Sequence, residues 1–167
     1  MVVVLLYVDD IILMGSNYDE VNRINYAKKL VDKFGMINRK KSYTPLNVNP
    51  KLNRDEGTCL PFPRPYHALV GSLVYLTLTR SDITYVVGVV SRYIQEPSKP
   101  HIEEANKILR YINTSPDNGL LYEKDAKFVL QGFADVDFAE DRDDRSSTSG
   151  FVFLCGNTSI SWGSKKQ

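Results

Sequence analysis

Two adjacent aspartates between two apolar runs constrain the fold of this chain more than any other feature. Asp9 and Asp10 follow the run from Val2 to Leu6 and come directly before the run from Ile11 to Met14. Both runs favour β-strands, so we expect a hairpin with the aspartates at its turn. Adjacent side chains of a strand point to opposite faces, and only a turn lets both carboxylates reach one cation. On turn chemistry alone, a pair of solvated aspartates on an ordinary hairpin is the commoner arrangement.

Apolar residues spaced three and four positions apart predict helices in the middle of the chain. The predicted helices cover residues 18–34, about 66–76, 82–95 and 101–112. Five of the eight prolines fall within residues 42–65, which predicts a loop there. Beyond residue 119 polar and apolar residues alternate, and the predicted strands cover residues 120–123, 128–134, 150–154 and 159–162. The expected fold class is therefore α+β, with an N-terminal β-hairpin, a helical middle and a β-rich C-terminal part.

Composition limits the functions that are open to the chain. Its 167 residues contain no run of about 18 apolar residues, so we expect no membrane-spanning helix. The N-terminal apolar stretch lacks a basic leader, so we expect no signal peptide and an intracellular location, in the cytoplasm or the nucleus. Cys59 and Cys155 are predicted to be free thiols. The net charge of +1 is lower than that of a typical free-standing nucleic-acid-binding protein.

The hairpin segment and the helical middle share a resemblance to one family. Residues 5–15, which read LLYVDDIILMG, resemble the palm hairpin of reverse transcriptases from copia-type retrotransposons (Pseudoviridae). Residues 66–76 and the motif TRSDI at 79–83 are similar to the thumb and connection of the same polyproteins. The resemblance implies that Asp9 and Asp10 are catalytic and hold Mg²⁺. In such polymerases a pair of ions clamps the attacking and the leaving oxygen of phosphoryl transfer.

A second acidic block lies near the C-terminus. Residues 132–141 read GFADVDFAED, and SSTSGFVF follows at 146–153. This order resembles the opening of a copia-type ribonuclease H domain with its first three strands. The resemblance implies that Asp135 is a catalytic ligand of Mg²⁺ in two-metal hydrolysis. Asp137 would share its face of the strand. Without the resemblance, the acidic stretch is typical of a solvated turn.

The two blocks divide the chain into three predicted parts. These are a reverse transcriptase palm remnant at 1–46, a helical thumb- or connection-like segment at 47–117, and the N-terminal part of a ribonuclease H-like domain at 118–167. In the family, a further palm aspartate precedes the hairpin, other palm segments follow it, and further ribonuclease H acids lie beyond the position of Gln167. Because the printed sequence contains none of these, we expect both ligand sets to be incomplete and Mg²⁺ binding to be weak or absent. We expect the chain alone to lack polymerase and nuclease activity.

Three functions remain open on this evidence. The first is an inert remnant that acts by binding, with a protein as one possible partner. The second is a chain that supplies Asp9, Asp10 and Asp135 to a complementing polymerase chain. The third is a non-catalytic module that binds a primer–template or an RNA–DNA hybrid, the partners that the family implies. The near-neutral charge argues against tight binding, and the scattered basic residues and helical tyrosines receive no site role. The oligomeric state is left open.

Overall fold

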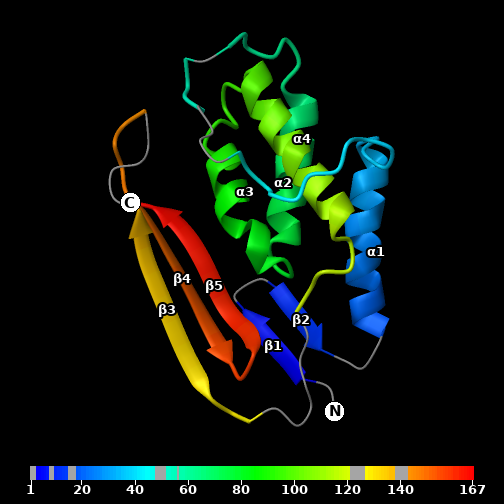
Figure 1. The fold of residues 1–167 in the computed structure, drawn as a ribbon, viewed down its shortest axis with the longest axis vertical. Coiled ribbons are helices and arrows are strands. Elements are labelled where there is room, and N and C mark those ends of the chain that lie inside the picture. Colours follow the sequence, from blue (N-terminus) through cyan, green and yellow to red (C-terminus); the bar gives the residue numbers. More distant parts are fainter. Residues whose placement is uncertain are drawn as a thin grey trace.

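We describe the fold from a computed structural model (Figure 1). It describes residues 3–7, 10–14, 18–47, 52–55, 57–120, 127–137 and 143–167, and only the backbone of those before Tyr26. Within these residues the elements are, in chain order, β1 (Val3–Tyr7), β2 (Asp10–Met14), α1 (Tyr18–Lys33), α2 (Arg64–Leu76), the 3₁₀ turn η1 (Ser81–Ile83), α3 (Thr84–Ser91), α4 (Lys99–Thr114), β3 (Leu130–Asp137), β4 (Thr148–Cys155) and β5 (Thr158–Lys166). The helices form one body, with a hairpin and a three-stranded sheet beside it (Figure 1). The predicted α+β class is confirmed.

The strands β1 and β2 form the predicted antiparallel hairpin. Tyr7 pairs with Asp10, and the pairing extends to Val3 opposite Met14. Asp10 is therefore the first residue of a strand, and the prediction that both aspartates form the turn is wrong for this residue. The reason is register, because the antiparallel pairing includes Asp10 opposite Tyr7. Asp9 lies outside the described residues.

The main hydrophobic core lies between the helices. Helix α2 contributes Leu69 and Leu73, helix α4 contributes Ile108 and Leu109, and all four side chains are at most 1% exposed. Helix α1 packs against α4, so segments far apart in the sequence lie side by side (Figure 1). The described helices include none that is both long and apolar enough to cross a membrane.

The second predicted helix of the middle is shorter than expected. Residues Ser81–Ile83 form η1, and α3 ends at Ser91 rather than at Gln95. After Val90 the backbone amides bond to carbonyls three residues back, which is the tighter turn that often closes a helix. Pro97 follows, and the residue before a proline avoids the helical conformation.

Helix α4 begins two residues before the predicted start at His101 because of its cap. The Ser98 amide donates to Nδ1 of His101 (2.9 Å), which closes a capping box. The opposite ring nitrogen therefore carries the proton, and Nε2 donates to the carbonyl of Asn53 (3.1 Å). The buried His101 ring stacks on Tyr93 with centroids 3.9 Å apart. One histidine thus joins α4 to the loop before α2.

The C-terminal sheet is antiparallel in the order β3-β4-β5, with a bulge between Phe153 and Leu154. The strands predicted at 150–154 and 159–162 are confirmed within β4 and β5. The strand predicted at 128–134 begins later, at Leu130, and continues to Asp137. The strand predicted at 120–123 falls almost wholly on positions outside the described residues. Both predicted free thiols, Cys59 and Cys155, are confirmed.

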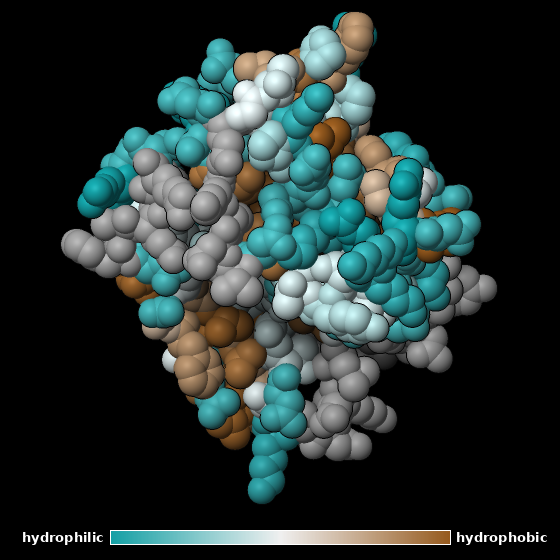
Figure 2. Space-filling view, turned by 45° about the horizontal axis from the view of Figure 1, so that its top comes forward, coloured by the Kyte–Doolittle hydropathy of each residue, from teal (hydrophilic) through white to brown (hydrophobic). Residues whose placement is uncertain are grey.

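One face of this sheet is apolar and exposed. The rings of Phe151 and Phe153 lie over Gly163 and Gly132, where an added Cβ would come within 2.7 Å of a ring carbon. These two rings remain 45% and 44% exposed. Figure 2 shows hydrophobic residues (brown) gathered at the lower left, on the side where Figure 1 places the sheet. The two phenylalanine rings thus cover the two glycines but stay partly exposed, so they do not form a second buried core.

Candidate functional site

The residues predicted as metal ligands lie in two separate sheets. Asp10 belongs to β2 of the hairpin, whereas Asp135 belongs to β3. In the part of the chain that the structure describes, the hairpin and the three-stranded sheet share no strand pairing. The side chain of Asp10 is not among the side chains described, and Asp9 lies outside the described residues. Asp135 is therefore the predicted ligand whose surroundings the structure describes.

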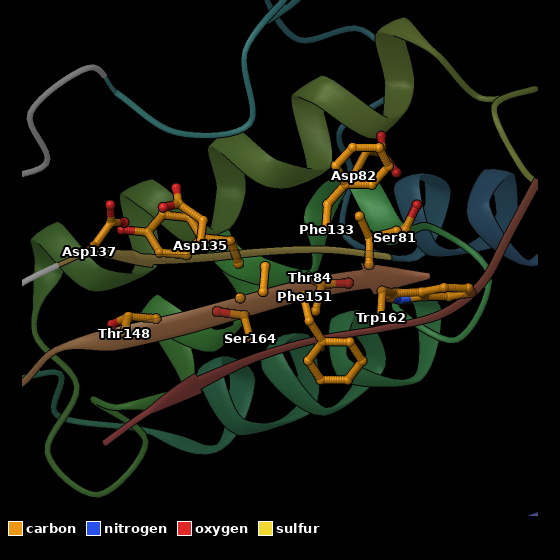
Figure 3. Close-up of a pocket in the computed structure, with 15 residues that line it drawn as sticks. Ser81, Asp82, Thr84, Phe133, Asp135, Asp137, Thr148, Phe151, Trp162 and Ser164 are labelled. Atoms are coloured by element: carbon orange, nitrogen blue, oxygen red, sulfur yellow. The ribbon is translucent and has the colours of Figure 1, made fainter. Parts of the chain in front are cut away.

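Asp135 lines a cavity of about 490 Å³ between the C-terminal sheet and the start of α3. Asp135 and Asp137 alternate with Val136, and their carboxylates point to the same side of β3 in Figure 3. Both side chains are exposed. From the helical body, Asp82 on η1 and Thr84 at the start of α3 contribute to the lining. The cavity thus has three carboxylates on its walls.

The carboxylate of Asp82 is already engaged. Nε and Nη2 of Arg80 donate to its two oxygens at 2.9 and 2.7 Å, and the hydroxyl of Tyr111 donates to Oδ2 at 2.9 Å. Arg80 also donates to the carbonyl of Ser115 (2.8 Å) and is only 2% exposed. Burial alone would raise the pKa of Asp82, but the hydrogen bonds and charge of Arg80 and the bond from Tyr111 outweigh it and lower this pKa. Sequence reasoning missed this network.

Acid should destabilise the protein through Asp82. Its pKa is lowered in the folded state, so its contribution is present above the unfolded pKa and is lost as the pH falls through the folded value. Between about pH 4 and pH 2, the free energy of unfolding should fall more steeply for the wild type than for Asp82→Asn. Urea unfolding at a series of pH values measures this difference. The exposed Asp55→Asn is the control, and a variant slope equal to that of the wild type would contradict the prediction.

Among the described residues, polar contacts fix the C-terminal sheet and the segment before β4 to the helices and to the loop before α2. The indole Nε1 of Trp162 on β5 donates to the carbonyl of Thr77 at 3.1 Å. Nη2 of Arg92 donates to Oγ1 of Thr148 at 3.0 Å, and the amide of Arg54 donates to a carboxylate oxygen of Asp143 at 2.9 Å. The cavity of Asp135 lies between these two bodies (Figure 3). Its shape therefore depends on how the sheet is held.

The carboxylate oxygens around Asp135 do not form the ligand set of a two-metal centre. One oxygen of Asp135 accepts a bond from the amide of Val136 (2.9 Å), and Asp82 is held by Arg80. Among the described residues no group of three or more histidine, cysteine, aspartate or glutamate side chains could hold one ion. Mg²⁺ demands a nearly complete octahedron of oxygens. Asp135 and Asp137 supply only part of one such shell.

Comparison with known proteins identifies the family. No protein-family model matches the chain, and no solved structure matches it significantly. The "Retrovirus-related Pol polyprotein from transposon RE2" of Arabidopsis thaliana is 39% identical over 85% of this chain and 10% of that polyprotein. The polyprotein from transposon TNT 1-94 of Nicotiana tabacum is 36% identical over 85% of this chain and 11% of its own length. An uncharacterized mitochondrial protein of Arabidopsis thaliana is 32% identical over 98% of this chain and 82% of its own length. This chain belongs to the copia-type retrotransposon Pol family.

Membership of the copia-type Pol family confirms the resemblance inferred from the two acidic motifs. The chain spans about a tenth of the length of the RE2 polyprotein, so the activities of a whole copia-type polyprotein are not thereby its own. The boundaries of the three predicted parts stay predictions. The same holds for the catalytic and metal-binding roles of Asp9, Asp10 and Asp135.

Proposed function

We propose that this chain is a retrotransposon-derived remnant of reverse transcriptase and ribonuclease H that is catalytically inactive alone and acts by binding. The observation that carries the proposal is the small number of free carboxylates around Asp135. Asp137 lies on the same strand, and Asp82, the carboxylate across the cavity, is bound by Arg80. Two-metal catalysis needs several oxygens fixed around both ions at once. Among the described residues, Asp135 and Asp137 supply only part of such a set.

The proposal includes weak binding of Mg²⁺. Asp135 and Asp137 are exposed neighbours on one strand face, so water competes for every ligand position. A site with few protein ligands keeps most of the ion's water shell and gains little affinity. We expect a dissociation constant for Mg²⁺ on the order of 1 mM or weaker by calorimetry. A value in the low micromolar range that is lost in Asp135→Asn would count against the proposal.

The purified chain should neither extend a primer on an RNA template nor cleave an RNA–DNA hybrid. The expected rates with Mg²⁺ or Mn²⁺ equal those of a no-enzyme blank, because neither ligand set forms a complete metal centre. Labelled nucleotide incorporation and hybrid cleavage on gels measure the two activities, with an intact copia-type polyprotein enzyme as the positive control. Incorporation that Asp9→Ala abolishes, or cleavage that Asp135→Asn abolishes, would overturn the proposal. Residual activity that both variants retain would indicate a contaminant.

A further inference from the structure

The strand β3 forms an open edge of the C-terminal sheet. It pairs with β4 on one side, and on its other side it pairs with no strand that the structure describes. Every residue of β3 is exposed, and Figure 1 shows it as the outermost strand of the sheet, at the left. The other edge strand, β5, contacts α3 instead. The outward side of β3 is therefore accessible to another strand.

The hydrogen-bonding pattern shows which backbone groups of β3 point to this open side. The amide of Gly156 donates to the carbonyl of Val129 at 2.8 Å, and these two residues continue the register of β3 with β4. Bonded and non-bonded pairs alternate along an antiparallel ladder. The odd-numbered residues of β3 therefore bond to β4, and the even-numbered ones direct their amides and carbonyls outward. The amide of Val136 agrees with this, because it donates to the side chain of Asp135 at 2.9 Å.

The edge lacks most of the features that keep natural sheet edges from pairing. Such features include proline, lysine, a β-bulge and a very short strand. The eight residues of β3 read LQGFADVD and pair with β4 without interruption. Its two charged residues, Asp135 and Asp137, line the cavity on the helical side of the sheet. A regular strand of this length can accept a partner along its whole edge.

The sequence of this edge is complementary to itself. When two copies pair in antiparallel fashion, outward residues must face outward residues, so an even-numbered residue faces an even-numbered one. One register meets this rule over all of residues 127–137, with Gly132 facing Gly132 at the two-fold axis. In this register Lys127 faces Asp137 of the second copy.

Opposite charges meet at both ends of this pairing. Lys127 and Asp137 are exposed, and neither forms an ion pair with a residue that the structure describes. Odd-numbered residues form the closer, non-hydrogen-bonded pairs, in which facing Cβ atoms lie about 4.5–5.5 Å apart. Asp135 is then the diagonal neighbour of Lys127. The two-fold axis forms these contacts twice, and no carboxylate faces another carboxylate.

Apolar side chains meet on the opposite face of the sheet. Phe128 is 84% exposed and faces Val136, which is 55% exposed, and Leu130 faces Ala134. An aromatic ring opposite a β-branched side chain is a favourable cross-strand pair. The ring of Phe153 already covers each glycine at the axis. The pairing thus covers apolar groups that water reaches in the single chain.

We infer that two copies of this chain form a dimer through β3. Their three-stranded sheets join into one six-stranded antiparallel sheet in the order β5-β4-β3-β3-β4-β5. A two-fold interface uses the same edge of both copies, so the assembly closes at the dimer. An edge of this length buries less surface than a standard protein interface, and we expect a dissociation constant on the order of 10 µM.

The mass of the protein in solution tests the dimer directly. Sedimentation equilibrium, at concentrations from well below to well above the expected dissociation constant, should show monomer and dimer and no larger species. A chain that stays monomeric throughout would overturn the inference and would leave the edge to a strand of another protein. Mass that grows beyond the dimer would overturn it too, because a two-fold interface closes.

Exchange of the paired charges tests the register. Lys127→Glu and Asp137→Lys should each weaken dimerisation at least about tenfold, because each variant places like charges at both ends of the pairing. An equimolar mixture of the two variants should dimerise like the wild type, since every facing pair again has opposite charges. The controls Lys165→Glu and Asp55→Lys reverse the same charges at exposed positions away from this edge. A mixture that stays monomeric, or equal losses in the controls, would overturn the inference.

Ala134→Pro tests the backbone bonds between the two copies. The amide of Ala134 points outward, so proline removes a donor of the open edge and no bond to β4. This variant should be monomeric and should keep the circular dichroism spectrum of the wild type. A folded Ala134→Pro that dimerises like the wild type would contradict the inference. If proline prevents folding, the mixture of the two charge variants still decides the question.

This inference goes beyond the proposed function and can fail separately from it. Strand pairing needs no metal ion, so a chelator should leave the dissociation constant of the dimer unchanged. Loss of the dimer in the chelator would indicate a metal-bridged contact and would overturn the inference. Catalysis by a dimer that passes these tests would overturn only the proposed inactivity.

Discussion

Replacing Leu73 with alanine should lower the free energy of unfolding by about 2–5 kcal/mol. The side chain of Leu73 on α2 is 0% exposed and lies in the core shared by the four helices. Truncation removes buried methyl and methylene groups and leaves a cavity that surrounding side chains fill only in part. Urea unfolding followed by the helical circular dichroism signal measures the change.

The neighbouring residue supplies the control for this prediction. Val74 is 48% exposed on the same helix, and Val74→Ala removes apolar groups that water already reaches. Its effect should stay within about 0.5 kcal/mol, since alanine is also the better helix former. Equal losses from Leu73→Ala and Val74→Ala would show that α2 does not pack as described.

Arg80→Ala should cost about 2–3 kcal/mol of stability. Arg80 is 2% exposed and donates hydrogen bonds to Asp82 and to the carbonyl of Ser115. Without Arg80, Asp82 and the end of α4 lose charge-assisted bonds, although partial exposure of the Asp82 carboxylate allows water to replace some of them. Thermal or urea unfolding measures the loss.

The exposed Arg64 on the same helical body is the matched control for Arg80. Arg64→Ala should change the free energy of unfolding by less than about 0.5 kcal/mol, because surface substitutions away from such networks have small effects. Arg80→Ala should also abolish the extra acid sensitivity attributed to Asp82. A variant that unfolds like Arg64→Ala would contradict the role assigned to the network.

Local sequence patterns predicted much of the fold because local forces determine those parts. Apolar spacing placed the helices α1, α2, α3 and α4, since the same residues form the core. Alternation of polar and apolar residues placed β4 and β5 as well, although their side chains do not join the helical core. The end of α3 was missed because the apolar pattern continues to Ile94 while the backbone tightens before Pro97. Periodicity reports which side chains face the core and not where hydrogen bonding changes.

The surroundings of the candidate site could not be predicted because its contacts join distant segments. Arg80 and Ser115 are 35 residues apart, and Trp162 and Thr77 are 85 apart. No local pattern indicates which of several arginines becomes buried. The motif around Asp135 predicted a strand residue with an acidic neighbour, and the structure places it on β3 beside Asp137. The residues that face Asp135 across the cavity depend on how the C-terminal sheet packs against the helices.

The pairing of α1 with α4 has a consequence for synthesis on the ribosome. Core residues from Ala27 to Ile112 contribute to one cluster, so it cannot close until α4 has left the exit tunnel. Until then the nascent chain carries the apolar faces of α1, α2 and α3 without the α4 surface that covers them in the folded protein. Such exposed apolar surface makes a partly synthesised chain prone to aggregation.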